Sequence, residues 1–284
     1  MSARTKTHSI NKPGFLVYAL LAAFVLGSLF PLYWSYVMGT VTKERTLQSP
    51  PPLVPGGHFI DNAKRVFDQI DFWSALLNSV IVSSIGALSV VAFSTLAGYA
   101  FAKLRFKGSN TLMAFIVMTL AVPTQLALVP MLKQFSNLGL DGTLAAVTLP
   151  WLVTAFGVFF MRQYLVDAIP DELIDAARVD GCSQIRIAWT VAVPAARPAM
   201  AILALFTFMS VWTDFMWPLL VLQNSDVQTL QTALDKLKIA PGQGLSDLAL
   251  LQAGTIMATI PLLLLFIATG RHLVSGIMQG AVKG

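Results

Sequence analysis

Long uncharged apolar runs alternate with short charged segments along the chain. Residues 15–42 and 72–102 hold no charged side chain, and the second of these runs is 31 residues long. About 20 apolar residues in a helix cross the hydrocarbon core of a bilayer. The pattern therefore predicts six membrane-spanning helices, within the ranges 15–42, 72–102, 108–132, 142–161, 198–222 and 248–270. The apolar part of a cleavable secretory signal has only about 7–15 residues, so the first run is interpreted as an uncleaved anchor.

Prolines and small residues interrupt the apolar runs. Prolines inside a membrane helix indicate either a broken helix that lines a cavity or a tolerated kink, and both interpretations stay open here. Ser94, Gly98 and Ala102 repeat a small residue at every fourth position, which predicts the close approach of another helix. The prolines within the predicted spans are Pro31, Pro123, Pro130, Pro150, Pro218 and Pro261.

Asp214 is the only acidic residue set well inside a predicted span, and Trp212 lies beside it. A carboxylate within a membrane is costly and is usually paired or turned toward a polar cavity. Asp214 and Trp212 are therefore candidates for a polar pathway through the membrane. A contact to a neighbouring subunit, or a position near the outer interface, is equally consistent. Asn78 begins the second span and is predicted to form a hydrogen bond between helices.

The composition agrees with an all-α integral membrane protein. The 284 residues are 56% hydrophobic and 12% charged, with a mean hydropathy of +0.70, whereas a soluble domain is typically about 25% charged. The single cysteine excludes an internal disulfide, and the three histidines are too scattered to indicate a metal site. No phosphate-binding loop, zinc-protease motif or nucleophile-elbow motif occurs, so no catalytic residue is predicted, and any ATP would be bound by another chain.

Lys and Arg residues predict the orientation in the membrane. Three of them lie in the five residues 103–107, and three more lie in the tail 1–14, which holds no acid. Short basic loops remain in the cytoplasm. Both termini and the loop 165–197 are therefore predicted to be cytoplasmic. The expected organisation is a basic tail at 1–14, a membrane domain at 15–270 and a second tail at 271–284.

The loop 165–197 is the longest charged segment that is not predicted to span, and it reads as two short helices. Asp171 can cap the first, and Gly181 can end it in the left-handed conformation that glycine adopts at low cost. Ser183 can cap the second, which Pro194 is expected to stop. Four apolar residues of the second helix share one face at helical spacing and are expected to pack on the membrane bundle: Ile185, Ala188, Trp189 and Ala192.

This loop resembles the signature of binding-protein-dependent ABC importers. In each membrane subunit of that family, a cytoplasmic loop carries Glu-Ala-Ala, two residues, Asp-Gly-Ala, eight residues and Ile-x-Leu-Pro. The chain has Asp175-Ala176-Ala177, Asp180-Gly181-Cys182 and Val191-Ala192-Val193-Pro194 in that register. The residues 214–222 and 271–284 are similar to the second permease of carbohydrate importers, the maltose MalG type. In this family the loop is the coupling helix that docks into the ATPase.

The resemblance implies a multi-pass protein of the bacterial cytoplasmic membrane that imports a sugar or oligosaccharide. The coupling residues would be Asp175, Ala176, Ala177, Asp180, Gly181, Cys182 and Pro194. The implied partners are a second, different permease, two ATPase subunits and an extracytoplasmic sugar-binding protein, with no nucleic acid. ATP and Mg would be bound by the ATPases, and this chain would hold no cofactor and be no enzyme.

Two alternatives differ in substrate or in energy source. An importer for glycerol phosphate would want an Arg or Lys within a span, and the predicted spans hold none. An ion-coupled secondary transporter would be expected to show related halves and more intramembrane carboxylates than Asp214 alone.

Overall fold

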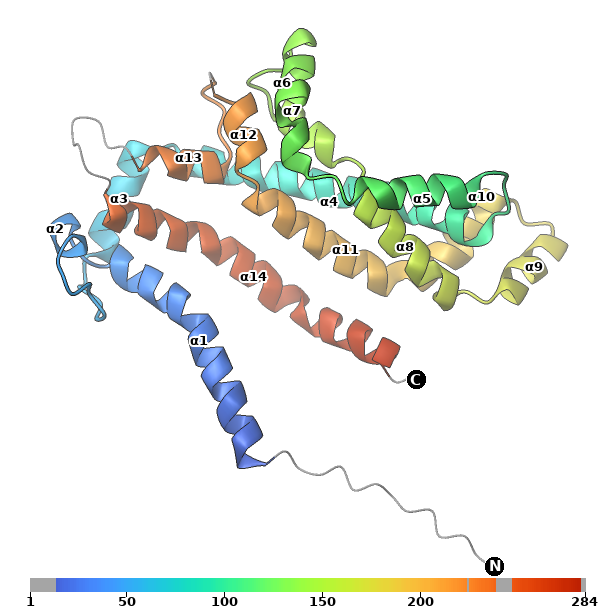
Figure 1. Ribbon diagram of the computed structural model, residues 1–284, viewed down its shortest axis with the longest axis horizontal. Coiled ribbons are helices and arrows are strands. Elements are labelled where there is room, and N and C mark those ends of the chain that lie inside the picture. The colour runs from blue at the N-terminus through green and yellow to red at the C-terminus, as the bar shows by residue number, and fades with distance from the viewer. Residues whose placement is uncertain (1–13, 224, 239–246, 282–284) are drawn as a thin grey trace, which may run out of the picture.

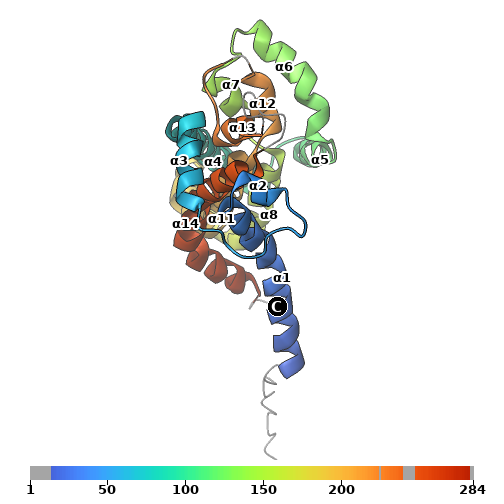
Figure 2. The same cartoon turned by 90° about the vertical axis from the view of Figure 1, so that its left-hand side faces the viewer.

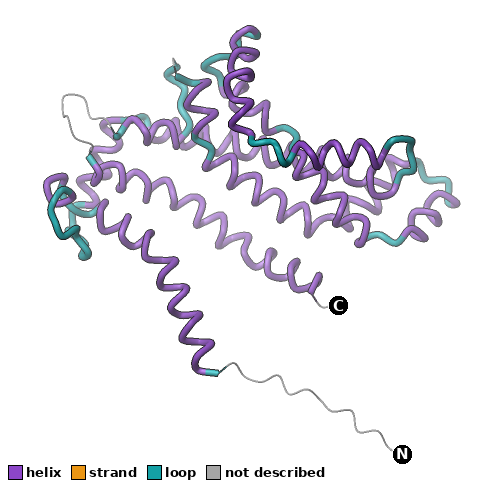
Figure 3. The backbone as a smooth tube through the Cα atoms, in the orientation of Figure 1, coloured by secondary structure: helices purple, strands orange, loops and turns teal. Residues whose placement is uncertain are grey.

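The described residues, 14–223, 225–238 and 247–281 of this computed structural model, form helices and no strand (Figures 1 and 3). The five longest helices are α1 (Phe15–Gly39), α4 (Phe72–Lys103), α8 (Ala155–Ala168), α11 (Val193–Thr213) and α14 (Leu248–Ala281). Shorter helices lie between them: α2 (Lys43–Thr46), α3 (Phe59–Gln69), α5 (Ser109–Thr119), α6 (Leu128–Asn137), α7 (Leu144–Thr148), α12 (Met216–Val221) and α13 (Leu230–Lys236).

The predicted all-α membrane fold is confirmed. Five helical segments of the described chain are long and apolar enough to cross a membrane. The bent pair formed by α5 and the segment 124–137 makes a sixth. The predicted span 248–270 agrees with the membrane-capable segment Leu248–Thr269, but its helix α14 continues to Ala281, so part of the expected tail at 271–284 is helical.

The third predicted span is not one straight helix. α5 ends at Thr119, and the chain turns by 89° before it continues through the 3-10 helix η1 (Thr124–Ala127) and α6. Pro123 lies at this break, where the residue before a proline is pushed out of helical geometry. In Figure 2, α6 rises away from the rest of the bundle. The predicted loop after residue 132 is correspondingly shorter, because α6 runs to Asn137.

The fourth predicted span is also interrupted. α7 passes into the 3-10 helix η2 (Leu149–Trp151), and an irregular stretch precedes α8. α8 extends to Ala168, seven residues beyond the expected end, so Arg162 lies within a helix and not in the loop. Arg197 likewise lies in α11. Both arginines therefore lie on helices that overlap predicted spans, outside the predicted ranges 142–161 and 198–222 themselves.

The helix that contains the fifth span begins earlier than predicted, because Pro194 does not end the preceding helix. α10 (Gln184–Ile187) continues through the π-helix η3 (Ala188–Ala192) into α11 without a break. The Val193 N–H reaches back five residues to the carbonyl of Ala188. A proline has no N–H to donate, and the wider π register lies directly before Pro194. The helix then ends at Asp214, before α12.

α4 is the central helix, with α8 and α11 packed along it. Small residues permit the approach that the sequence predicted. A side-chain carbon at Gly98 would lie 2.7 Å from the Met161 Cβ, and one at Gly157 would lie 2.4 Å from the Ser94 Oγ. The buried core around this contact includes Met161, Leu165 and Leu203.

Candidate functional site

The residues 170–192, called here the coupling unit after their predicted role, lie at one end of the molecule, where α9 (Asp171–Val179) and α10 are found (Figure 1). The first helix ends as predicted. Gly181 has a φ of +77°, its N–H donates to the Arg178 carbonyl, and the Cys182 N–H donates to the Ala177 carbonyl at 3.0 Å. This pair of bonds is a Schellman motif, which requires a left-handed residue at the glycine position.

The start of α9 differs from the prediction. Pro170 is the N-cap and Asp171 is the first helical residue, so Asp171 does not cap the helix with its side chain. The second helix does begin as predicted, because the Ser183 Oγ accepts from the Arg186 N–H at 3.3 Å. The two caps fix a tight turn between the helices.

The face of the second helix that packs on the bundle was predicted only in part. Ala188 and Ala192 are buried, but Ile185 is 74% exposed and Trp189 is 59% exposed. Ile187 takes the predicted place of Ile185 and is fully buried in the core formed with α8 and α4. On α9, Ile174 is the residue buried in this same core. The bulky side chains expected to fix the unit to the membrane bundle instead point away from it.

The C-terminal end of α4 contacts both helices of the coupling unit. Lys103 Nζ lies 2.8 Å from Asp171 Oδ1 and donates to the Val166 carbonyl of α8 at 3.2 Å. The Tyr99 hydroxyl donates to Gln184 Oε1 of α10 at 3.1 Å. Because Asp171 accepts a hydrogen bond from Lys103, its pKa lies below the ordinary value for aspartate. Neither Tyr99 nor Lys103 was singled out from the sequence.

The remaining predicted coupling residues lie around the turn. Asp175 pairs with Arg178 at 3.0 Å on the exposed side of α9, and Asp180 and Ala176 are exposed. Ala177 and Cys182 are half-buried against the bundle core. Four large apolar side chains of this unit are exposed: Leu173, Val179, Ile185 and Trp189.

A cavity of about 800 Å³ lies where three helices are broken. Its wall includes the segment after α5, the stretch before α8 and the junction of α11 with α12. This junction lies between the two ends of the molecule in Figure 1. Non-helical backbone at membrane depth is tolerated where it lines a cavity or is buried in protein. The breaks near Pro123, Pro150 and Pro218 therefore favour broken helices over simple kinks.

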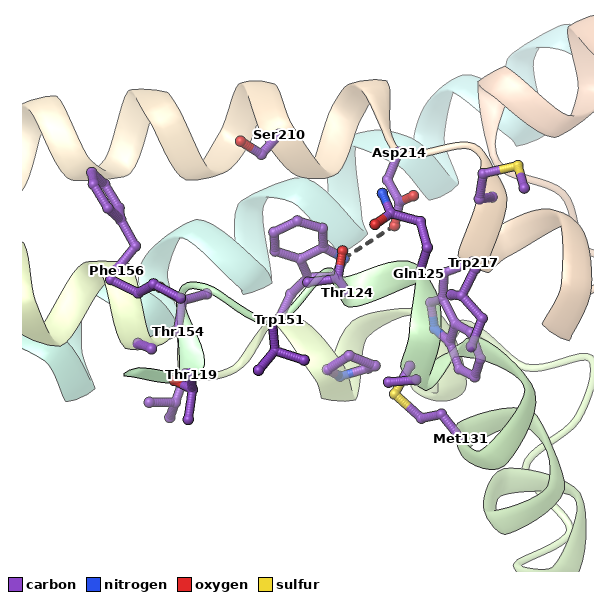
Figure 4. A pocket seen from close by; sticks show the side chains of 18 of the residues that line it. Thr119, Thr124, Gln125, Met131, Trp151, Thr154, Phe156, Ser210, Asp214 and Trp217 are labelled. Carbon is purple, nitrogen blue, oxygen red and sulfur yellow. Dashed lines mark hydrogen bonds between the residues drawn. The ribbon is translucent and has the colours of Figure 1, made fainter. Parts of the chain in front are cut away.

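Asp214 faces this cavity together with Trp151, Thr124 and Gln125 (Figure 4). Trp151 Nε1 donates to Asp214 Oδ2 at 3.3 Å. Trp151 itself packs against α4, since a side-chain carbon at Gly86 would lie 3.3 Å from the Trp151 Cβ. Trp151 and Gln125 were not identified from the sequence, because an aromatic or amide residue in an apolar run carries no signal of what it faces.

The other two candidates lie elsewhere. Trp212 is 3% exposed and stacks on Phe208 with ring centroids 5.7 Å apart, in the core between α11, α14 and α3. It does not line the cavity. Asn78 donates from Nδ2 to the Gln228 carbonyl at 2.9 Å, so its partner is the segment before α13 and not another helix. Asp214 is the one predicted pathway residue that borders the cavity.

The family comparison covers the coupling unit and the cavity. Residues 91–277, which include this unit and every residue that lines the cavity, match the family described as the binding-protein-dependent transport system inner membrane component. The chain belongs to this family. It is thus a multi-pass inner-membrane permease component of an ABC importer, as the loop's register had indicated.

Similarity to known permeases covers most of the chain. The arabinooligosaccharides transport system permease protein AraQ of Halalkalibacterium halodurans is 34% identical over 79% of this chain and 80% of its own length. The lactose transport system permease protein LacG of Rhizobium radiobacter is 33% identical over 95% and 97%. The sn-glycerol-3-phosphate transport system permease protein UgpE of Shigella flexneri is 29% identical over 95% and 98%.

A solved structure has the same fold. It is a chain of a bacterial ABC transporter involved in the import of the acidic polysaccharide alginate. That chain aligns with a TM-score of 0.77 at 23% identity, over 94% of this chain and 99% of the other. The two chains therefore share one fold over nearly their whole lengths.

Proposed function

We propose that this permease is one of two different membrane subunits of an ATP-driven importer for a sugar or oligosaccharide. The observation that carries the proposal is that the coupling unit has one face buried in the bundle core and an opposite apolar face that is exposed. Its packing face holds Ile174 and Ile187 in the core, while Ile185 and Trp189 remain exposed on the other side. Exposed aromatic and aliphatic groups beside a rigid turn are suited to docking in a cleft of another protein. The proposed occupant is an ATPase subunit, which would bind the ATP and Mg.

The proposed cycle links the unit to the cavity through α4. Closure of two ATPase subunits would move the coupling unit, and the contacts of Tyr99 and Lys103 would pass this motion to α4. Trp151 of the cavity wall packs against the same helix at Gly86. This chain would form half of the pathway, with the sugar delivered by an extracytoplasmic binding protein. The names of the AraQ and LacG relatives support a sugar as the substrate.

The orientation is part of the proposal. Lys103, at the edge of the basic turn 103–107, contacts the coupling unit, so both lie at one end of the molecule. Short basic segments favour the cytoplasm. We therefore place this end, and both chain termini, in the cytoplasm.

Purification of the tagged full-length permease tests the assembly. The expected result is that an ATPase and a second permease co-purify, and that uptake of a labelled sugar by vesicles requires ATP. Uptake that needs only an ion gradient, with no ATPase associated, would contradict the proposal and favour a secondary transporter. Uptake of glycerol 3-phosphate in preference to sugars would favour the UgpE-like alternative.

A further inference from the structure

The polar groups of the cavity are mainly hydrogen-bond acceptors. The hydroxyls of Thr119, Ser210 and Thr213 each donate to a backbone carbonyl three or four residues earlier in the same helix, at 2.6, 2.9 and 2.9 Å. A hydroxyl that has donated its only hydrogen still offers lone pairs. These side chains therefore present oxygen acceptors to whatever enters the cavity.

The charged group of the cavity, the Asp214 carboxylate, is also a hydrogen-bond acceptor. Asp214 carries the carboxylate, and the only N–H of the Trp151 side chain is already donated to it. Of the described residues that line the cavity, none is Lys, Arg or His. Gln125, Thr124 and Thr154 are the side chains there that can still donate, since the Thr154 hydroxyl accepts from the Gly157 N–H and keeps its own hydrogen. An anion would therefore meet a carboxylate and few donors, whereas a ligand rich in hydroxyl hydrogens would find partners.

An apolar surface accompanies these acceptors. Trp151, Phe156, Phe215 and Trp217 all line the cavity, and Figure 4 shows the Trp151 ring beside Asp214. Sugars combine hydroxyl groups with an apolar C–H face. The cavity volume of about 800 Å³ lies within the range of about 300–1,000 Å³ typical of small-molecule sites.

We propose that this cavity is a subsite for an uncharged sugar, held by this permease itself. Sugar hydroxyls donate to Asp214 and to the Ser and Thr oxygens, and the apolar face of one sugar ring packs on Trp151. The subsite disfavours phosphorylated and carboxylated solutes. This inference rests on the proposed function and narrows its substrate class.

Substrate protection in the assembled transporter tests the subsite. A Ser210→Cys chain in a Cys182→Ser background is reconstituted with its partners, and labelling of this chain by a methanethiosulfonate reagent is timed. A mixture of cellobiose, maltose and lactose is expected to slow the labelling, and glycerol 3-phosphate is not. Thr213→Cys repeats the measurement at a second position of the wall.

Variants of Asp214 decide the role of the carboxylate. Asp214→Asn is expected to raise the sugar concentration needed for half-protection by about tenfold or more, since hydrogen bonds to charged groups are the stronger ones. Asp214→Glu is expected to retain most of the protection, and Trp151→Phe to lose part of it. Asp141→Asn, on an exposed loop, is the matched control and is expected to change nothing.

The possible outcomes distinguish a failure of the proposed subsite from a failure of the proposed function. Sugar uptake driven by ATP, together with unchanged protection in Asp214→Asn, overturns the subsite alone. Stronger protection by glycerol 3-phosphate, or by glucosamine as a cationic probe, also overturns the preference for uncharged sugars. Import of another solute with no sugar uptake overturns the proposed function. Failure of Asp214→Asn and Asp214→Glu to assemble with the partner subunits, while Asp141→Asn assembles, assigns Asp214 to a structural role and overturns the subsite.

Discussion

The coupling unit and the central cavity show opposite uses of interrupted helix. In the coupling unit, the interruption at Gly181 is short and is closed by a Schellman motif on one side and the Ser183 cap on the other. In the cavity, three breaks leave irregular backbone and mostly exposed polar side chains around an open space. A capped turn transmits force because it has one conformation, whereas a broken helix offers backbone and side-chain groups to a ligand. The difference indicates that the same residue types, Gly and Pro, support stiffness at one place and access at the other.

The largest effect is expected from removing the turn. Gly181→Val places a β-branched residue at a φ of +77°, where an L-residue costs about 1–2 kcal/mol. We expect the permease to insert normally and ATP hydrolysis to become uncoupled from sugar uptake. The measurement is the ratio of sugar imported to ATP hydrolysed by reconstituted vesicles.

Gly139→Val is the matched control for this experiment. Gly139 also has a positive φ, +66°, with no neighbouring atom within 4 Å, but it lies in the loop between α6 and α7. The strain is similar and the coupling unit is untouched. A normal ratio for Gly181→Val at normal expression, or an equal loss in Gly139→Val, would remove the turn from the coupling mechanism.

A charge reversal at Lys103 is expected to have the next largest effect. Lys103→Glu opposes Asp171 with a like charge and leaves the Val166 carbonyl without its donor. We expect reduced uptake, and partial restoration in the double variant Lys103→Glu with Asp171→Lys. Lys107→Glu changes an exposed residue of the same basic turn and serves as the control. Equal losses in both single variants would indicate a general effect of charge.

Substitutions of two isoleucines on α10 distinguish packing against the bundle from docking to the ATPase. Ile187→Ala empties a fully buried position and should destabilise the permease by about 2–5 kcal/mol. Ile185→Ala changes a residue that is 74% exposed, so it should leave the unfolding midpoint unchanged while weakening retention of the ATPase on a tagged permease. Thermal unfolding in detergent and co-purification measure the two quantities. A loss of stability for Ile185→Ala would contradict the assignment of the exposed face.

The smallest effect is expected from pH. The hydrogen bond from Lys103 depresses the pKa of Asp171, so this contact is present above the ordinary aspartate pKa of about 3.9 and is lost as pH falls through the lower folded value. The difference in unfolding midpoint between the wild type and Lys103→Met should therefore stay constant from pH 8 to about pH 5 and shrink below about pH 4. A difference that disappears already near pH 6 would assign the effect to another group.

The sequence alone determined the features that depend on neighbours along the chain. The length of each apolar run set the number of membrane-capable segments, with α4 found within one residue of its predicted end. The turn at Gly181 and the cap at Ser183 were predictable because a cap is satisfied by N–H groups two to five residues away. The repeat of Ser94 and Gly98 also predicted close helix packing, since only the size of those residues matters there.

Only the tertiary structure decided which side of each element faces inward. Ile185 and Ile187 are chemically identical, and their different burial depends on where α4 and α8 lie. Bulk is a poor guide to burial where small residues let membrane helices approach, so Ala188 and Ala192 pack while Trp189 is exposed. The pairing of Lys103 with Asp171 and the contact of Trp151 with Asp214 join residues that are more than 60 positions apart, so no local pattern encodes their proximity. These contacts are set by the packing of whole helices. A buried polar group needs a hydrogen-bond partner, and that partner can come from any helix of the bundle, however distant along the chain.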